Sequence, residues 1–165
     1  MSSNDPSAPP TATLLKRLFS LVYDLFILLA LSMGYAATAT IVMVNIFGVE
    51  DSGDYAPMQN GPWFGIGWLA CIALFYWFFW YRAGQTVGMR AWRLKLVTTD
   101  ATPLGSKHIM LRILSAPVSV AACGLGYLWC LFHPNKMAWH DLASATKVVQ
   151  LPKTEKESKK KKGKS

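Results

Sequence analysis

The residue best placed to do chemistry is a carboxylate inside an apolar run. Asp24 is the only charged side chain between Leu18 and Phe47. An ionisable side chain at the centre of a membrane helix costs on the order of 3 kcal/mol on insertion scales, so its presence indicates a role. We therefore expect Asp24 to lie on an ion or substrate path, or to dock the first helix through a buried ion pair.

Asp24 needs a partner that its own helix does not supply. Arg17 lies on the same helical face, but two turns separate the two side chains by about 10 Å. A direct pair within the helix is excluded at that distance, so the partner must be water or a more distant residue. The cationic candidates are Arg112, Arg90, Arg93 and His140.

The patterns of other reaction centres are missing from the sequence. The candidate soft metal ligands are Cys123, Cys130, His133 and His140. Their spacing matches no zinc pattern, and no phosphate-binding glycine loop or nucleophile elbow is present. We expect no metal, no cofactor and no enzymatic activity.

A short polar block, GQTVGMR at residues 84–90, contains two glycines four residues apart. Gly84 and Gly88 would permit a close approach of two backbones. Because the block lies outside any long apolar helix, we expect a tight turn at the membrane surface in preference to helix dimerisation.

The composition indicates a membrane protein. Hydrophobic residues make up 52% of the chain and charged residues 16%, below the roughly 25% typical of soluble domains. The net charge of +8 could indicate a nucleic-acid partner. The basic residues, however, do not interleave with aromatic residues on a polar face, so we expect none.

Two apolar runs, at about residues 18–47 and 63–81, are long enough to be membrane helices. A cleaved signal peptide is the alternative for the first run, but Asp24 and the long polar leader argue against it. The acidic loop at 48–62 predicts an outside location, and the basic segment at 82–108 predicts a cytoplasmic one. We therefore expect a cytoplasmic N-terminus.

The third apolar run, at about residues 109–132, leaves two alternatives open. As one transmembrane helix it would put the lysine-rich C-terminus outside, against the charge bias. Pro117, Gly124 and Gly126 can instead break it into a hairpin that enters and leaves from one side. The β-like stretches 94–100 and 146–151 could pair only on one side of the membrane, so we favour the hairpin.

These observations predict an all-α membrane protein with two full transmembrane helices, a third apolar segment and short cytoplasmic β-like stretches. We expect residues 1–13 to be a disordered leader, 14–151 the membrane domain, and 152–165 a disordered lysine-rich tail. Anionic lipid is a possible ligand of that tail, although plain solvation is favoured.

Three blocks of the sequence together resemble the RDD family of small bacterial integral membrane proteins. They are KRLFSLVYDLFIL at 16–28, GQTVGMRAWRLKLV at 84–97 and GYLWCLFHPNKMAWHDLASATKVV at 126–149. The resemblance implies that Arg17 is the family arginine and that Asp24 and Asp141 are its aspartates. It also assigns a central motif, namely Gly84, Gln85, Gly88 and Arg90. The chain departs from the family at His133, where relatives often carry an acid before the proline.

The resemblance implies a multi-pass protein of the bacterial cytoplasmic membrane, in contact with the lipid bilayer. Our first hypothesis is a small transporter or transporter subunit, with cation/proton coupling as reported for some family members. Asp24 and Asp141 would be the acceptors, Arg17 the charge partner, and His140 a further residue of the ion path. The alternative is a non-enzymatic scaffold or accessory protein in which these residues are structural. So short a chain offers few helices, so we expect a homo-oligomer.

Overall fold

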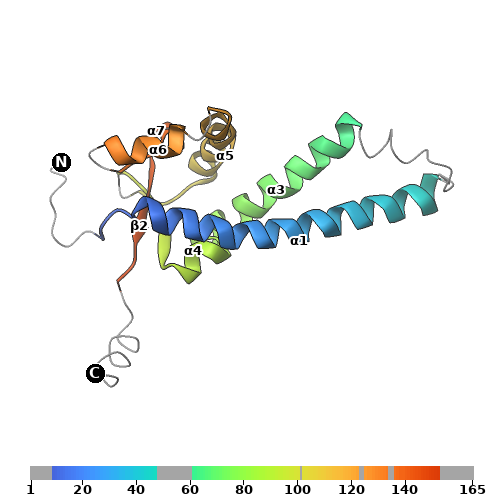
Figure 1. Ribbon diagram of the computed structural model, residues 1–165, viewed down its shortest axis with the longest axis horizontal. Helices are drawn as coiled ribbons and strands as arrows, with labels where there is room; N and C mark the ends of the chain where they lie inside the picture. The colour runs from blue at the N-terminus through green and yellow to red at the C-terminus, as the bar shows by residue number, and fades with distance from the viewer. Residues whose placement is uncertain (1–8, 48–60, 101, 123–124, 134–135, 153–165) are drawn as a thin grey trace, which may run out of the picture.

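The computed structural model describes residues 9–47, 61–100, 102–122, 125–133 and 136–152. Two long helices project from a compact group of short elements (Figure 1). We call this group the head; it comprises the first turns of α1 and all elements after α3. In chain order the elements are α1 (Leu14–Phe47), α3 (Pro62–Ala83), α4 (Val87–Ala91), β1 (Leu94–Thr98), α5 (Ser106–Ala121), α6 (Leu125–Phe132), α7 (Trp139–Ala143) and β2 (Thr146–Gln150).

The two predicted membrane helices are confirmed as helices long and apolar enough to cross a membrane. α3 has 22 residues, about 33 Å at 1.5 Å per residue, which matches the roughly 30 Å hydrocarbon core. α1 is longer, with 34 residues, and begins at Leu14, before the predicted start. Large apolar side chains are exposed along both helices, as a lipid environment requires.

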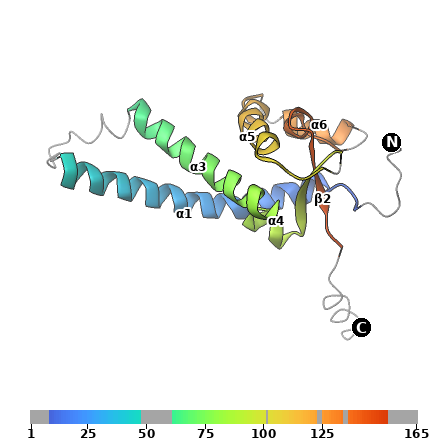
Figure 2. The ribbon, with the colours of Figure 1, turned by 180° about the vertical axis from the view of Figure 1, so that it is seen from behind.

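The third apolar run is broken into two helices, α5 and α6, which belong to the head and do not run parallel to α1 and α3 (Figures 1 and 2). The two helices touch where Gly126 packs against Ser119. A Cβ atom added at Gly126 would lie 2.6 Å from Cβ of Ser119. The run therefore forms two helices and not one continuous third helix.

A small antiparallel sheet closes the head. β1 pairs with β2 in a register that sets Leu94 opposite Gln150 and Thr98 opposite Thr146. Alternate side chains of β1 point inward, so Leu94 and Leu96 are buried while Lys95 is exposed. With Ile109 of α5 and Val148 of β2 these leucines form the centre of the hydrophobic core. The two predicted β-like stretches therefore do pair with one another.

The expectation that residues 1–13 are disordered is wrong for the end of that segment. Thr11 forms an antiparallel bridge with Val149 of β2. The amide of Ala12 donates to the carbonyl of Val148 at 2.9 Å, and the amide of Gln150 donates to the carbonyl of Pro10 at 2.9 Å. Ala12 is 1% exposed. Residues 10–12 thus add an edge to the sheet, while residues 1–8 and 153–165 lie outside the described ranges.

The central polar block forms a turn followed by a short helix. Gly84 ends α3 with a positive φ of 66°, a conformation that glycine adopts without steric cost. Thr86 then caps α4, since its side chain accepts from the amide of Met89 at 3.2 Å. Gly88 lies directly against α1, where an added Cβ would come 2.1 Å from the carbonyl oxygen of Ser20. The block therefore contains both the predicted turn and a close backbone approach.

Candidate functional site

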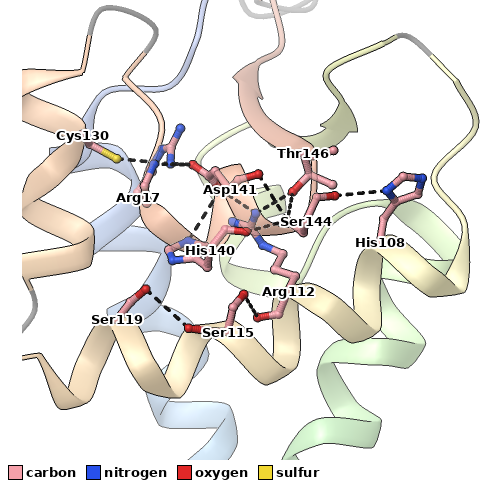
Figure 3. A network of polar contacts seen from close by, with 12 residues as sticks. Arg17, His108, Arg112, Ser115, Ser119, Cys130, His140, Asp141, Ser144 and Thr146 are labelled. Carbon is pink, nitrogen blue, oxygen red and sulfur yellow. Dashed lines mark hydrogen bonds and ion pairs between the residues drawn. The ribbon is translucent and has the colours of Figure 1, made fainter.

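Asp141 is the centre of a buried ion cluster in the head (Figure 3). Its side chain is 0% exposed. Arg17 of α1 donates from Nη1 to Oδ2 at 2.6 Å, and Arg112 of α5 donates from Nη1 to Oδ1 at 2.5 Å. The amide of Ala138 also donates to Oδ2, at 3.0 Å. We call Arg17, Arg112 and Asp141 the arginine–aspartate cluster.

Arg17 connects α1 to the C-terminal elements of the head. Its Nη2 donates to the carbonyl oxygen of Lys136 at 3.1 Å, and its Nη1 lies 3.7 Å from Sγ of Cys130 in α6. With the contact to Asp141, one side chain joins α1 to α6, to α7 and to the segment between them. Arg17 can contact all of these elements because it lies near the start of α1.

Arg112 makes the equivalent connections from α5. Its Nη1 donates to Oγ1 of Thr146, the first residue of β2, at 2.8 Å. Its guanidinium lies 5.3 Å from the ring centroid of Trp80 in α3, a cation–π contact that favours a desolvated arginine. Ser144 extends the network, with its Oγ 2.7 Å from Oγ1 of Thr146.

The electrostatics of the cluster keep Asp141 ionised. Burial alone would raise the pKa of Asp141, but Arg112, Arg17 and the Ala138 amide together hold that pKa well below its ordinary value. Burial, assisted by Arg112 and Arg17, lowers the pKa of His140 from 6.5 to about 3. His140 is therefore neutral at pH 7, although its Nε2 lies 3.6 Å from Oδ1 of Asp141.

Asp24 occupies a separate site between α1 and α4. Its side chain is 3% exposed. The hydroxyl of Thr86 donates to Oδ2 at 2.5 Å, and the amide of Gly88 donates to Oδ1 at 2.8 Å. Both described donors are neutral groups, and both belong to the central polar block. Asp24 thus forms one site with two residues that lie 62 and 64 positions further along the chain.

Of the four cationic candidates for a partner of Asp24, Arg112 and His140 lie at Asp141 instead. Arg112 binds Asp141, and His140 lies beside that same carboxylate. Of the other two candidates, Arg90 is exposed on α4 and Arg93 lies between α4 and β1 with a φ of 55°. The physical reason is that α5 and α7 pack together, whereas the Gly88 backbone reaches Asp24 directly.

The central motif residues have structural positions in the head. The carbonyl of Gly84 accepts from the amide of Leu96 at 2.8 Å, and Nε2 of Gln85 donates to the carbonyl of Leu94 at 2.7 Å. These two residues fix the end of α3 to β1, while Gly88 contacts Asp24. The side chain of Arg90 is exposed, so the structure does not bring it to either aspartate.

The sequence interpretation missed Thr86, and it considered Arg112 as a candidate partner of Asp24 only, whereas Arg112 binds Asp141. A threonine just before a short helix is a common N-cap, which could have singled out Thr86 within the block. A buried arginine in an apolar run also requires an acid, and Asp141 follows Arg112 within the same C-terminal half. Within the described ranges no group of three or more His, Cys, Asp or Glu side chains could hold a metal ion.

Comparison with known proteins identifies a family. The profile of the RDD family matches residues 11–145, from the N-terminal edge of the sheet to the residues between α7 and β2. This range includes Arg17, Asp24 and Asp141. No curated protein and no solved structure matches the chain.

Proposed function

The chain belongs to the RDD family, and we propose that it is a small multi-pass transporter or transporter subunit of the bacterial cytoplasmic membrane. The family and the two long apolar helices make it a membrane protein. The transport role is our inference from the site at Asp24, and the coupling ion would be a cation or a proton.

The sheet supports a topology with both ends of the domain in the cytoplasm. Residues 10–12, β1 and β2 pair in one sheet, so all three lie on the same side of the membrane. The basic residues of the head favour the cytoplasm for that side, according to the positive-inside rule. The hairpin of α5 and α6 would then enter and leave the membrane from the cytoplasmic side.

One observation carries the transport proposal, namely that the carboxylate of Asp24 is held by neutral donors. A buried carboxylate without a neighbouring cation favours uptake of a proton or a cation. Asp141 lacks this property, because two guanidiniums hold it ionised. We therefore assign the acceptor role to Asp24 alone and a structural role to Asp141 and Arg17.

Flux measurements in proteoliposomes test this proposal. Asp24→Asn keeps the shape of the side chain and removes its charge, so it should abolish ion-coupled flux while the protein stays folded. Asp100→Asn changes an exposed acid and should keep wild-type flux. Wild-type protein that moves no cation or proton under any imposed gradient would exclude the transport role.

The second candidate is a non-enzymatic scaffold or accessory protein. The arginine–aspartate cluster favours this alternative, because it connects α1, α5, α7 and β2. Such connections are what a purely structural site provides. In that case Asp24→Asn should weaken partner capture and leave no flux to lose.

Two long helices are too few to enclose a transport path, so we expect a homo-oligomer in which several copies surround it. Crosslinking in native membranes should give discrete multimers of this chain. A strictly monomeric protein would favour the scaffold instead.

A further inference from the structure

We propose that Thr86 determines the ion specificity of the Asp24 site, so that the site takes a proton and excludes metal cations. The inference rests on the proposed acceptor role of Asp24. The inference names the residue that would select the ion, and it describes the geometry of that selection.

Thr86 can form a hydrogen bond with Asp24 in both protonation states of the carboxyl group without changing its position. In the structure its hydroxyl donates to Oδ2 of Asp24 and accepts from the amide of Met89. When Oδ2 takes up a proton, the new O–H can donate back to Oγ1 of Thr86, because a hydroxyl has two acceptor lone pairs. The hydroxyl hydrogen of Thr86 then turns away, and Oδ1 continues to accept from Gly88. The contact reverses its direction and keeps its partners.

A metal cation cannot use the same contacts. It would need oxygen lone pairs directed at it from several ligands, yet Oδ1 faces the N–H of Gly88 and Oδ2 faces the O–H of Thr86. These donors would point positive charge at the ion. A cation could therefore use the lone pairs that face Thr86 and Gly88 only after both hydrogen bonds had broken.

The packing of α4 also leaves no room for an ion between Gly88 and Asp24. A single carbon added at Gly88 would lie 2.1 Å from the carbonyl oxygen of Ser20 and 3.0 Å from Oδ1 of Asp24. Thr86 is 1% exposed. A metal ion could enter between Gly88 and Asp24 only if α4 moved away from α1, whereas a proton needs one lone pair of Oδ2.

The basic side chains on the elements packed against the site bind other residues or are exposed. On α1, Lys16 donates to Gln150 and Arg17 binds Asp141. Arg90 of α4 and Arg82 of α3 are exposed. The chemistry at Asp24 is therefore set mainly by its neutral donors.

Infrared difference spectroscopy of the full-length protein in liposomes tests the proposal. A pH titration should reveal the carbonyl band of a protonated carboxylic acid that disappears in Asp24→Asn. The band should shift to higher frequency in Thr86→Val, which lacks the hydroxyl partner, and should stay near its wild-type frequency in Thr86→Ser. Replacing choline chloride by sodium, lithium or potassium chloride should leave the midpoint of the titration unchanged.

Two outcomes would overturn the inference. One is a wild-type titration midpoint that moves when a metal cation is added, because the cation would then compete with the proton at Asp24. The other is an Asp24 band that is identical in wild type and in Thr86→Val. Neither outcome requires a flux measurement. A protein that shows the Thr86-dependent band but transports nothing would refute the proposed function alone.

Discussion

The two buried aspartates differ in what holds them, and this difference decides what each substitution should do. Asp141 has two arginine partners, whereas the described partners of Asp24 are a hydroxyl and an amide. Removing one member of a buried ion cluster leaves uncompensated charge, which is more costly than altering a neutral hydrogen bond. Substitution of Asp141 should therefore affect mainly the stability of the protein, and substitution of Asp24 mainly its ion binding.

Asp141→Asn should destabilise the protein by about 3–5 kcal/mol, since Arg17 and Arg112 would stay buried without a counter-charge. Asp24→Asn should cost much less, because its amide can still accept from Gly88 and can donate to Thr86. Thermal unfolding of both variants in detergent measures the difference. Equal stability of the two variants would contradict the roles that we give to the two acids.

His140 should make stability depend on pH in mildly acidic solution. The pKa of His140 is 6.5 ordinarily and about 3 in the folded protein, so below pH 6.5 the unfolded chain binds one more proton. Stability is then full above pH 6.5 and falls as the pH drops toward 3, by up to about 1.4 kcal/mol per pH unit.

The substitution His140→Gln should remove this slope between pH 6.5 and 3.8. Asp141 does not interfere in that range, because its lowered pKa gives a contribution that is lost only as the pH falls below 3.8. Unfolding midpoints across this window, compared between wild type and variant, provide the measurement. Parallel pH profiles of the two proteins would contradict the buried neutral histidine.

Among the secondary-structure elements, α4 depends most on one small residue. The backbone of α4 reaches α1 because Gly88 has no side chain, and this approach brings its amide to Asp24. The contact makes the central polar block part of the Asp24 site instead of a simple connection between α3 and β1.

Gly88→Ala should destabilise the protein by roughly 1–3 kcal/mol, as overpacked sites do. The methyl group would force α4 away from Ser20 and break the hydrogen bonds to Asp24. Gly65→Ala is the matched control, because an added Cβ there meets nothing within 4 Å. If both alanine variants unfold at the same temperature, the close packing of α4 on α1 is not important for stability.

The sequence predicts the elements of this protein better than their contacts. Apolar length gives α1 and α3, and β-branched alternation gives β1 and β2. Pro117 and the glycines after it indicate a broken third run, though Pro117 lies within α5, which ends at Ala121, and α6 begins at Leu125.

The pairing of distant residues could not be read from local patterns. Arg17 and Asp141 are 124 residues apart, and only the family resemblance singled them out together. The edge formed by residues 10–12 also escaped prediction, because their polar, proline-rich composition resembles disorder. Their order comes from the unpaired side of β2, a property of the assembled sheet.

For the whole molecule, the sheet connects the start, the middle and the end of the domain. This arrangement implies an even number of complete membrane crossings between residue 12 and residue 146. The two long helices are long and apolar enough for two crossings, so we expect the α5–α6 hairpin to supply none.

Cysteine labelling in intact cells tests the topology. In a background without Cys71, Cys123 and Cys130, Ser165→Cys should react with a membrane-impermeant maleimide only after the cytoplasmic face is opened. Asp51→Cys should react from outside in intact cells. Labelling of Ser165→Cys in intact cells would instead require a third crossing.

The contact between Arg17 and Asp141 has a consequence for biosynthesis. A ribosome adding about 5–20 residues per second needs roughly 6–25 s to make the 124 residues that separate them. During that interval α1 can enter the bilayer while its arginine has no counter-ion from the nascent chain. The cluster can therefore assemble only after residue 141 has been made, and premature termination before that residue would leave Arg17 without its counter-ion.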